Sequence, residues 1–259
     1  MSRGLAVVTG ATAGIGREFA EQLGARGYDL LLVARDRPRL AATAEALAAS
    51  HRVEAEAFAA DLSRDDDVTR LVERLIASPR LTLLVNNAGF GSRGRLVEAD
   101  IEAQEAMLRL HVLAPMRLTR VALPVLLANR AGGVINVSSV AGFIYSAGNV
   151  NYCATKAYLT TFSEGLAAEL HGTGVGVQAL CPGFTRTEFH ARIPGPVERH
   201  PRFLWLSART VVAYSLHCLD RGGPVVCVPG FRWRLVVLAI RLMPRSLLGW
   251  VSRRRYSRV

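Results

Sequence analysis

Short apolar runs alternate with segments of helical pattern along most of this chain. Seven of these runs are predicted strands, at residues 5–9, 29–34, 53–60, 81–85, 133–137, 175–180 and 225–228. Strands that alternate with helices form a parallel sheet covered on both faces, because each connecting helix returns along one face of the sheet. No linker composition interrupts residues 4–230. The sequence therefore predicts a single α/β domain at 1–230, a doubly wound seven-stranded parallel sheet.

A glycine-rich turn joins the first predicted strand to the helical pattern at 17–26. Glycine permits a tight turn and close approach of a ligand to the backbone, and the N-terminus of the next helix presents unpaired N–H groups. This context favours a site for the pyrophosphate of a dinucleotide, although a plain strand-to-helix turn is the alternative. The residues expected at such a site are Gly10, Thr12, Gly14, Ile15 and Gly16.

The next two strand ends bear on the adenosine half of such a ligand. Arg35 follows the second strand, where an arginine suits the 2′-phosphate of NADP(H) and an acidic residue suits the ribose of NAD(H). Asp36 is adjacent, so either side chain can face the ribose, or Arg35 solvates a loop. Asp61 and Leu62 follow the third strand, where Asp61 accepts from the adenine amine or caps the next turn or helix. We expect NADP(H), with NAD(H) as the less favoured cofactor.

Tyr152 and Lys156 lie four residues apart, where a long helical pattern that runs through 154–170 begins. Side chains at this spacing share one face of a helix. Lys156 is the only lysine among 32 basic residues, which suggests that this position needs a compact ammonium charge. A neighbouring cation stabilises a phenolate and lowers the phenol pKa from about 10. The pair predicts proton transfer by Tyr152, with a solvated surface pair as the alternative.

Small and polar residues follow the next three strands. They read Asn86-Asn87-Ala88-Gly89, Ser138-Ser139 and Cys181-Pro182-Gly183-Phe184-Thr185-Arg186-Thr187. The carboxyl ends of parallel strands meet at one edge of the sheet, where open sheets bind ligands. One of the two serines is expected to donate to a substrate oxygen, although each segment is also a possible turn. Residues 184–206 lack a clear period and are predicted to form a loop over the substrate.

The net charge of +11 comes mainly from the end of the chain. No acidic residue follows Asp220, and residues 231–259 carry eight arginines. The main domain is therefore almost balanced in charge, and nucleic acid is not an expected partner. The four cysteines and six histidines show no metal-ligand spacing, so no metal site is expected. Residues 1–4 run directly into the first strand, which predicts a cytoplasmic protein without a signal peptide.

Five motifs together resemble the short-chain dehydrogenase/reductase family, and the resemblance covers residues 5–228. The motifs are TGxxxGIG at 9–16, NNAG at 86–89, the serine at 139, YxxxK at 152–156 and PGxxxT at 182–187. Their order and spacing match those of the family. The resemblance implies a Rossmann-type fold and an oxidoreductase in which a nicotinamide cofactor supplies the hydride chemistry.

The resemblance also implies roles for individual residues. Tyr152 would protonate a carbonyl oxygen that Ser139 hydrogen-bonds, and Lys156 would lower the tyrosine pKa and hold the nicotinamide ribose. Thr187 would hold the nicotinamide carboxamide, and further cofactor contacts would come from Asn87, Ala88, Gly89, Pro182, Gly183 and Thr185. One position departs from the family pattern, because His111 stands where an asparagine usually fixes a water that leads from the lysine. His111 either relays protons in its place or packs in the helix without a role.

The second strand and the C-terminal extension at 231–259 resemble ketoacyl and lipid reductases of the family, which implies a hydrophobic carbonyl substrate. Oxidation of a small alcohol, sugar or sterol is the alternative activity, and nucleotide binding without turnover is the non-enzymatic one. The apolar run at 233–243 is too short to span a bilayer, which takes about 20 residues. The extension is expected to cover the substrate pocket, to contact a membrane surface peripherally, or to pack on the domain or a partner subunit. Members of the family commonly form dimers or tetramers, so a homo-oligomer is expected.

Overall fold

A seven-stranded parallel sheet forms the centre of the molecule, in a computed structural model that describes residues 2–189, 201–244, 246–249 and 252. The strand order is β3-β2-β1-β4-β5-β6-β9, and every neighbouring pair is parallel. The strands are β1 (Leu5–Thr9), β2 (Asp29–Ala34), β3 (Ala55–Ala59), β4 (Leu81–Asn86), β5 (Gly133–Val137), β6 (Gly176–Leu180) and β9 (Val226–Cys227). The predicted fold class is confirmed, although the third, sixth and seventh strands are shorter than predicted.

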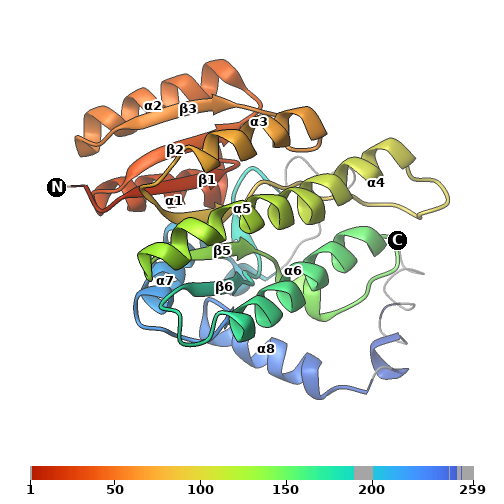
Figure 1. Ribbon diagram of the computed structural model, residues 1–259. Helices are drawn as coiled ribbons and strands as arrows, with labels where there is room; N and C mark the ends of the chain where they lie inside the picture. The colour runs from red at the N-terminus through yellow and green to blue at the C-terminus, as the bar shows by residue number, and fades with distance from the viewer. Residues whose placement is uncertain (1, 190–200, 245, 250–251, 253–259) are drawn as a thin grey trace.

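Two layers of helices cover the sheet, as Figure 1 shows. One face carries α1 (Gly14–Ala25), α2 (Arg37–His51) and α7 (Ala208–Asp220), and the other carries α3 (Asp65–Ile76), α5 (Ala114–Asn129) and α6 (Val150–Glu169). Ala6 and Val8 of β1 point into the first core, and Val7 points into the second. This alternation follows from the two-residue period of a strand. Because both faces are buried, the strands are apolar along their whole length.

The chain reverses its direction across the sheet between β1 and β4. From β1 it builds outward to β2 and β3, and it then returns to add β4, β5, β6 and β9 on the other side of β1. The connections that leave the carboxyl ends of β1 and β4 therefore run in opposite directions. Open α/β sheets bind their ligands at this switch point.

The long helical stretch that contains His111 is divided by a turn of wider helix. α4 (Ile101–Leu108) passes through the π-helical turn η1 (Arg109–Leu113) into α5. Pro115 at the start of α5 has no N–H group with which to continue an α-helical ladder to the carbonyl of His111. The wider turn places the His111 side chain in the protein interior. Such π-turns are frequent at functional sites.

The same helical stretch, 101–129, is long and apolar enough to cross a bilayer. In the structure it packs against α3 and β4, and Leu118 and Leu126 belong to one of the two main cores. Buried helices of globular proteins commonly have such a composition, so its length and hydropathy do not indicate a membrane span.

The segment at 184–206, predicted to be a loop, contains short regular pieces. β7 (Thr185–Arg186) pairs in parallel with β8 (Leu206–Ser207), and a 3₁₀ turn, η4 (Arg202–Leu204), precedes β8. The two ends of the segment are thereby held side by side. Residues 190–200, which belong to the predicted substrate loop, lie outside the described residues.

The predicted C-terminal extension begins with a helix, α8 (Phe231–Leu242), which lies along the lower edge of the molecule in Figure 1. Trp233 is buried against the domain, where its Nε1–H donates to the carbonyl of Leu204 at 2.8 Å. Its ring meets the ring of Phe184 edge-on, with 5.1 Å between the centroids. α8 therefore packs on the domain, and the division of the chain at residue 230 stays a prediction.

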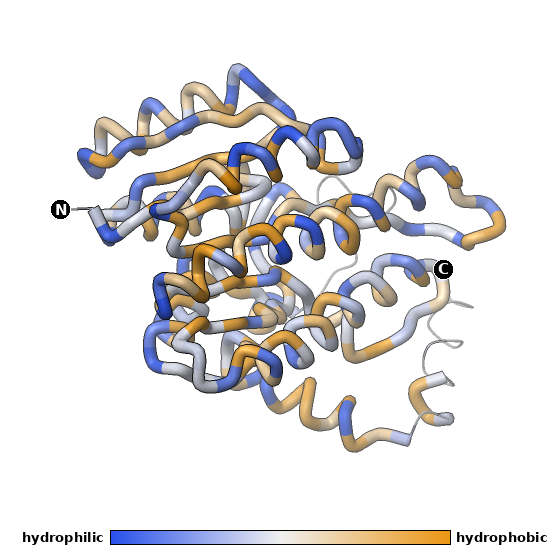
Figure 2. Tube along the Cα trace, viewed as in Figure 1, coloured by the Kyte–Doolittle hydropathy of each residue, from blue (hydrophilic) through white to orange (hydrophobic). Residues whose placement is uncertain are grey.

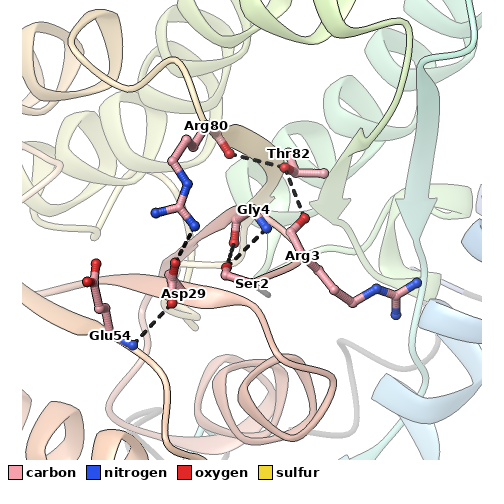
Figure 3. Close-up of polar contacts among 7 residues, drawn as sticks. All are labelled: Ser2, Arg3, Gly4, Asp29, Glu54, Arg80 and Thr82. Carbon is pink, nitrogen blue, oxygen red and sulfur yellow. Dashed lines mark hydrogen bonds and ion pairs between the residues drawn. The ribbon is translucent and has the colours of Figure 1, made fainter.

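A polar cluster closes the amino ends of β1, β2 and β4 (Figure 3). Asp29, the first residue of β2, accepts from the Glu54 N–H at 3.1 Å and pairs with the Arg80 guanidinium at 2.6 Å. Burial acts to raise the pKa of Asp29, but hydrogen bonds from Ser2, Glu54 and Arg80 together hold that pKa below its ordinary value. The Asp29 carboxylate therefore stabilises the folded state.

We predict that Asp29→Asn lowers the free energy of unfolding by about 1–3 kcal/mol at neutral pH, because the amide cannot accept all of these bonds as a charged group does. The folded pKa lies below the unfolded value of 3.8, so this stabilisation is complete above pH 3.8 and is lost as pH falls through the folded pKa. Urea unfolding at pH 7 and in acid measures it. The exposed Asp66→Asn serves as the control and should change less, and a difference for Asp29→Asn that stays constant into acid contradicts the prediction.

Candidate active site

Thr9, the last residue of β1, ties the end of its strand to the exit of β4. Its hydroxyl donates to the carbonyl of Val85 at 3.3 Å and accepts from the N–H groups of Asn87 and Ala88 at 2.9 Å each. The Asn87 Nδ2 group donates in return to the carbonyl of Thr9 at 2.8 Å. The two loops on either side of the switch point are therefore held in contact.

The glycine turn after β1 has no room for side chains. A Cβ atom on Gly10 would lie 2.8 Å from Asn87 Nδ2, and a Cβ atom on Gly16 would lie 2.2 Å from the carbonyl oxygen of Gly10. Gly10 and Gly14 also have positive φ angles of 68° and 54°. Glycine tolerates this conformation and this close approach, which explains why the turn needs it at these positions.

The first turn of α1 suits a bound anion. Ala13 at the N-cap makes no side-chain hydrogen bond, and the first turn carries no acidic residue. Its backbone N–H groups are thus available to a phosphate, and the helix dipole adds a partial positive charge. A Cβ atom on Gly14 would lie 3.0 Å from Thr187, so the loop after β6 borders the same space. The turn therefore fits the pyrophosphate of a dinucleotide. Thr12 is part of this turn, and the Ile15 side chain packs partly on the core.

The ends of β2 and β3 bring Arg35 and Asp61 together. Arg35 Nη1 lies 3.6 Å from Asp61 Oδ2, and the arginine side chain is 70% exposed. Asp36 instead caps α2 by accepting from the Arg39 N–H at 3.0 Å. Asp61 also accepts from the N–H and hydroxyl of Ser63 at 3.0 and 2.7 Å. The sequence left open whether Arg35 or Asp36 faces the ribose. Asp36 is engaged as the cap of α2, and Arg35 is not.

Asp61 and Leu62 occupy different environments after β3. Burial acts to raise the pKa of Asp61, but hydrogen bonds from Ser63 and the nearby Arg35 hold that pKa below its ordinary value. Asp61 thus caps a turn as a carboxylate, one of the two roles considered from the sequence. Leu62 is buried in a core cluster, so only its backbone is able to meet a ligand.

The two serines after β5 have different surroundings. Ser138 is buried, and its hydroxyl donates to the carbonyl of Lys156 at 2.7 Å and lies 2.9 Å from Thr160 Oγ1. Ser139 Oγ accepts from the Ala141 N–H at 3.1 Å and also makes a hydrogen bond with Tyr152. Ser138 therefore holds β5 against α6, and Ser139 is the serine that meets the tyrosine.

Tyr152 and Lys156 share one face of α6, as predicted. Lys156 Nζ lies 5.7 Å from the centroid of the Tyr152 ring and donates to the carbonyl of Val137 at 2.8 Å. Lys156 is buried, and burial lowers its pKa to about 8. Part of the Tyr152 surface is exposed, but the protein that encloses its hydroxyl raises the phenol pKa to about 12. Desolvation is the largest influence on the phenol pKa, and the lowering of that pKa by Lys156 stays a prediction.

His111 bridges the exit of β4 and the first turns of α6. Its Nε2 atom accepts from the Phe90 N–H at 3.1 Å, and its Nδ1 atom lies 3.1 Å from Thr155 Oγ1. The Thr155 hydroxyl donates to the carbonyl of Tyr152 at 2.9 Å. We therefore infer that Nδ1 carries the imidazole proton. Burial first, and the charge of Lys156 second, hold the His111 pKa well below 6.5, so the ring is neutral at physiological pH.

Contacts with neighbouring loops and α8 fix the exit of β6. The Val140 N–H donates to the carbonyl of Pro182 at 3.1 Å, and the Thr185 hydroxyl donates to the carbonyl of Gly183 at 3.1 Å. A Cβ atom on Gly183 would lie 2.0 Å from the Trp233 ring, so this glycine packs flat against α8. Pro182, Gly183 and Thr185 set the path of the loop that carries Thr187 to the glycine turn.

Aromatic rings flank Tyr152 on two sides. The Phe189 ring centroid lies 6.0 Å from that of Tyr152, and the His111 ring meets Tyr152 edge-on at 6.1 Å. Phe90 in turn packs on His111 with 5.8 Å between the centroids. The Tyr152 ring therefore has aromatic neighbours in Phe189 and His111.

Sequence reasoning missed the residues that hold this site in place. A buried amide network joins β4, β5 and α6: Asn86 Nδ2 donates to Asn136 Oδ1 at 2.8 Å, and Asn136 Nδ2 donates to Ser163 Oγ at 2.9 Å. Thr9 and Thr155 were missed as well. An asparagine inside the apolar run of β5 was a usable signal, because a buried polar side chain requires partners.

No metal centre is formed within residues 2–189, 201–244, 246–249 and 252, where no group of three His, Cys, Asp or Glu side chains is able to hold a metal ion. Cys153, Cys181, Cys218 and Cys227 are all buried free thiols. Burial raises the pKa of the Cys181 thiol to about 11, so this thiol is protonated at neutral pH. These cysteines therefore pack as small apolar groups.

Comparison with known proteins agrees with this geometry. The family model for short chain dehydrogenases matches residues 4–196. A 3-oxoacyl-[acyl-carrier-protein] reductase of Aquifex aeolicus is 32% identical over 72% of this chain and 76% of the relative. A very-long-chain 3-oxoacyl-CoA reductase of Coprinopsis cinerea is 37% identical over 67% of this chain, and the match spans 52% of that longer protein.

The solved structures include a close likeness in shape. A short-chain dehydrogenase from Sphingobium yanoikuyae, solved in complex with NADPH, is 35% identical and superposes with a TM-score of 0.83. The match covers 92% of this chain and 94% of that one. The likeness therefore extends over most of the fold.

Proposed function

The chain belongs to the short-chain dehydrogenase/reductase family, and from this premise we propose that it reduces a carbonyl group of a hydrophobic substrate with NADPH. Membership makes it an oxidoreductase that uses a nicotinamide cofactor. The observation that carries the proposal is the meeting of Ser139, Tyr152 and Lys156 next to the carboxyl end of β5. The proposal goes beyond family membership in three respects, namely the cofactor preference, the direction of the reaction and the substrate class.

The protein groups supply the proton and the orientation in this reaction. The bound cofactor supplies the hydride. The Ser139 hydroxyl holds the carbonyl oxygen of the substrate, and the Tyr152 hydroxyl gives that oxygen its proton as the oxygen becomes an alkoxide. Lys156, fixed through Val137, holds the ribose hydroxyls of the cofactor and carries a nearby positive charge. Proton donation by a positioned group typically contributes about 10²–10⁴ in rate.

The protonation state of Tyr152 supports its proposed role as the proton donor. With its pKa raised to about 12, the phenol is protonated at neutral pH, which is the form that a proton donor requires. Lys156, with a pKa of about 8, stays mostly charged at pH 7. Carbonyl reduction is the direction that we propose.

The proposed preference for NADPH rests on Arg35. Its guanidinium is exposed at the end of β2, while the competing Asp36 carboxylate is engaged as the cap of α2. An arginine at this strand end suits a 2′-phosphate. The residues proposed to hold the cofactor are Gly10, Thr12, Gly14, Ile15, Gly16, Arg35, Asp61, Leu62, Asn87, Ala88, Gly89, Tyr152, Lys156, Pro182, Gly183, Thr185 and Thr187.

The proposed substrate is a hydrophobic ketone or ketoacyl compound. The Phe189 ring packs beside that of Tyr152, and the Phe90 ring packs on His111, which in turn meets Tyr152. Relatives from Aquifex aeolicus and Coprinopsis cinerea are named as 3-oxoacyl reductases. Both features favour an acyl or lipid carbonyl over a sugar. A panel of substrates separates this proposal from its two alternatives. These are oxidation of a small alcohol, sugar or sterol, and nucleotide binding without turnover.

We propose that His111 positions the catalytic turn of α6 and does not relay protons. Both of its ring nitrogens are engaged, one by the Phe90 N–H and one by Thr155. Through the Thr155 hydroxyl it holds the carbonyl of Tyr152, which fixes the direction of the tyrosine side chain. The Nε2 atom accepts from a backbone N–H, which does not give up its proton near neutral pH, so this nitrogen has no partner with which to exchange a proton.

We expect Tyr152→Phe to lower kcat for NADPH-dependent ketone reduction by about 10²–10⁴, because the proton donor is lost while the ring remains. NADPH absorbance, followed with ketones of graded chain length, acyl thioesters, sterols and quinones, measures it. Tyr158→Phe on the same helix is the matched control and should leave kcat unchanged. Turnover retained by Tyr152→Phe contradicts the mechanism, and no turnover by the native protein with any compound contradicts the enzyme assignment.

We expect Arg35→Ser to raise the KM for NADPH about tenfold or more and to leave the KM for NADH nearly unchanged, because a charge-assisted hydrogen bond contributes about 1.5–3 kcal/mol. Arg120→Ser, on the exposed side of α5, removes the same charge elsewhere and should affect neither cofactor. Equal changes for the two cofactors would mean that Arg35 does not contact the 2′-phosphate.

For His111→Asn we expect the pH dependence of kcat to coincide with that of the native protein between about pH 6 and 9, because the native ring does not ionise there. For His111→Phe we expect a lower kcat with little change in the KM for NADPH, because the Phe90 N–H loses its acceptor and the Tyr152 turn loses its tie. If His111→Asn shifts the pH profile of kcat, the proposal is wrong and His111 does relay protons.

A further inference from the structure

α8 is fixed to the domain by one of its faces. Trp233 and Val237, four residues apart, are both buried, and Trp233 donates to Leu204. Three arginines brace the helix from its edges: the guanidinium of Arg232 lies 5.3 Å from the Phe203 ring, that of Arg234 5.7 Å from Tyr214, and that of Arg241 4.9 Å from Phe143. The orientation of α8 on the domain is thus determined from both sides.

The opposite face of α8 carries a second apolar surface, which we call the outer stripe. It consists of Phe231, Leu235, Leu238 and Leu242, which are 65%, 49%, 53% and 76% exposed. At about 100° per residue, these four positions fall on one line along the helix, about half a turn from Trp233 and Val237. Figure 2 shows apolar residues and hydrophilic residues interleaved along this helix. An apolar stripe of this kind, away from the core, indicates a contact with something outside the domain.

The charge beside the outer stripe is positive. Arg232 borders one edge, and Arg234 and Arg241 border the other, where they line a groove of about 630 Å³ between α8, α6 and β9 together with Glu164 and Leu238. Within the part of the chain that the structure describes, none of these three arginines forms an ion pair with a carboxylate. The sequence has no acidic residue after Asp220 and eight arginines in 231–259.

These features fit one class of partner. A second copy of the chain, docked face to face, would bring the arginines of both stripes together, and like charges repel. A nucleic acid would neutralise the arginines but would leave four apolar side chains against a phosphate backbone. An anionic lipid surface suits both the apolar outer stripe and the arginines beside it. Its acyl chains contact the apolar side chains, and its headgroups bind the guanidinium groups.

We propose that α8 is a peripheral membrane-binding helix whose outer stripe enters the surface of an anionic bilayer. With 12 residues, it extends about 18 Å and lies in the plane of the surface, since the hydrocarbon core is about 30 Å thick. The buried face stays on the domain during binding, so the catalytic fold does not need to open. This inference is independent of the substrate proposed above.

Flotation of the full-length protein with vesicles tests the proposal. We expect the native protein to float with vesicles of phosphatidylcholine and phosphatidylglycerol, and much less with phosphatidylcholine alone. Leu235→Ser with Leu242→Ser should weaken the binding at least tenfold, because two exposed leucines lose their burial in lipid. The matched control is Ile76→Ser with Leu127→Ser, which removes two exposed apolar side chains from α3 and α5 and should bind as the native protein does.

The charge contribution has its own variant. Arg234→Gln with Arg241→Gln should reduce binding to the anionic vesicles and should lower its dependence on salt, because fewer counter-ions are exchanged. Circular dichroism and turnover of each variant establish that the fold is retained. Equal flotation with neutral and anionic vesicles, or equal flotation of the native and Leu235→Ser/Leu242→Ser proteins, overturns the proposal. So does a change in oligomeric mass in the leucine variant without a change in flotation, since the stripe would then be a subunit contact.

Discussion

The hydroxyl of Thr9 holds together the two sides of the sheet on which the rest of the site is built. It accepts from two successive N–H groups after β4 and donates to the carbonyl of Val85 before them. The loops after β1 and β4 run in opposite directions from the switch point, and this hydroxyl ties them together. The Asn87 Nδ2 group adds a second tie by donating to the carbonyl of Thr9. The shape offered to a dinucleotide therefore depends on these two side chains.

Desolvation is the largest influence on the pKa of Tyr152, and it raises that pKa to about 12. Lys156 Nζ lies 5.7 Å from the centroid of the Tyr152 ring and donates a hydrogen bond to the carbonyl of Val137. Burial lowers the pKa of Lys156 to about 8. The result is a protonated phenol beside a charged ammonium, an arrangement prepared to donate a proton. His111 adds rigidity to the same turn through Thr155, and its neutrality avoids a second positive charge next to Lys156.

The fold and the grouping of the site residues were predictable because they follow from period and position. Apolar runs alternating with helices fix a parallel sheet, and parallel strands bring Asn87, Ser139 and Thr187 to one edge. The net pKa of Tyr152 was not predictable, because burial depends on residues distant in sequence such as Phe189. The π-turn at His111 was not predictable for a related reason. Pro115 indicates that the α-helix is interrupted, but the packing of neighbouring residues decides which kind of turn forms there. Ser138 and Ser139 are adjacent and of the same residue type, so the residues alone did not decide which one meets Tyr152.

The sheet ends differently at its two sides, and this has a consequence for how the protein behaves at high concentration. β9 offers only two residues of ladder, and β3 pairs on one side only and carries Glu56 in an ion pair with Arg74. A short border and a charged border both discourage pairing with a strand from another molecule. The molecule thus guards against fibrous aggregation at both margins of the sheet, and this protection does not depend on substrate or cofactor.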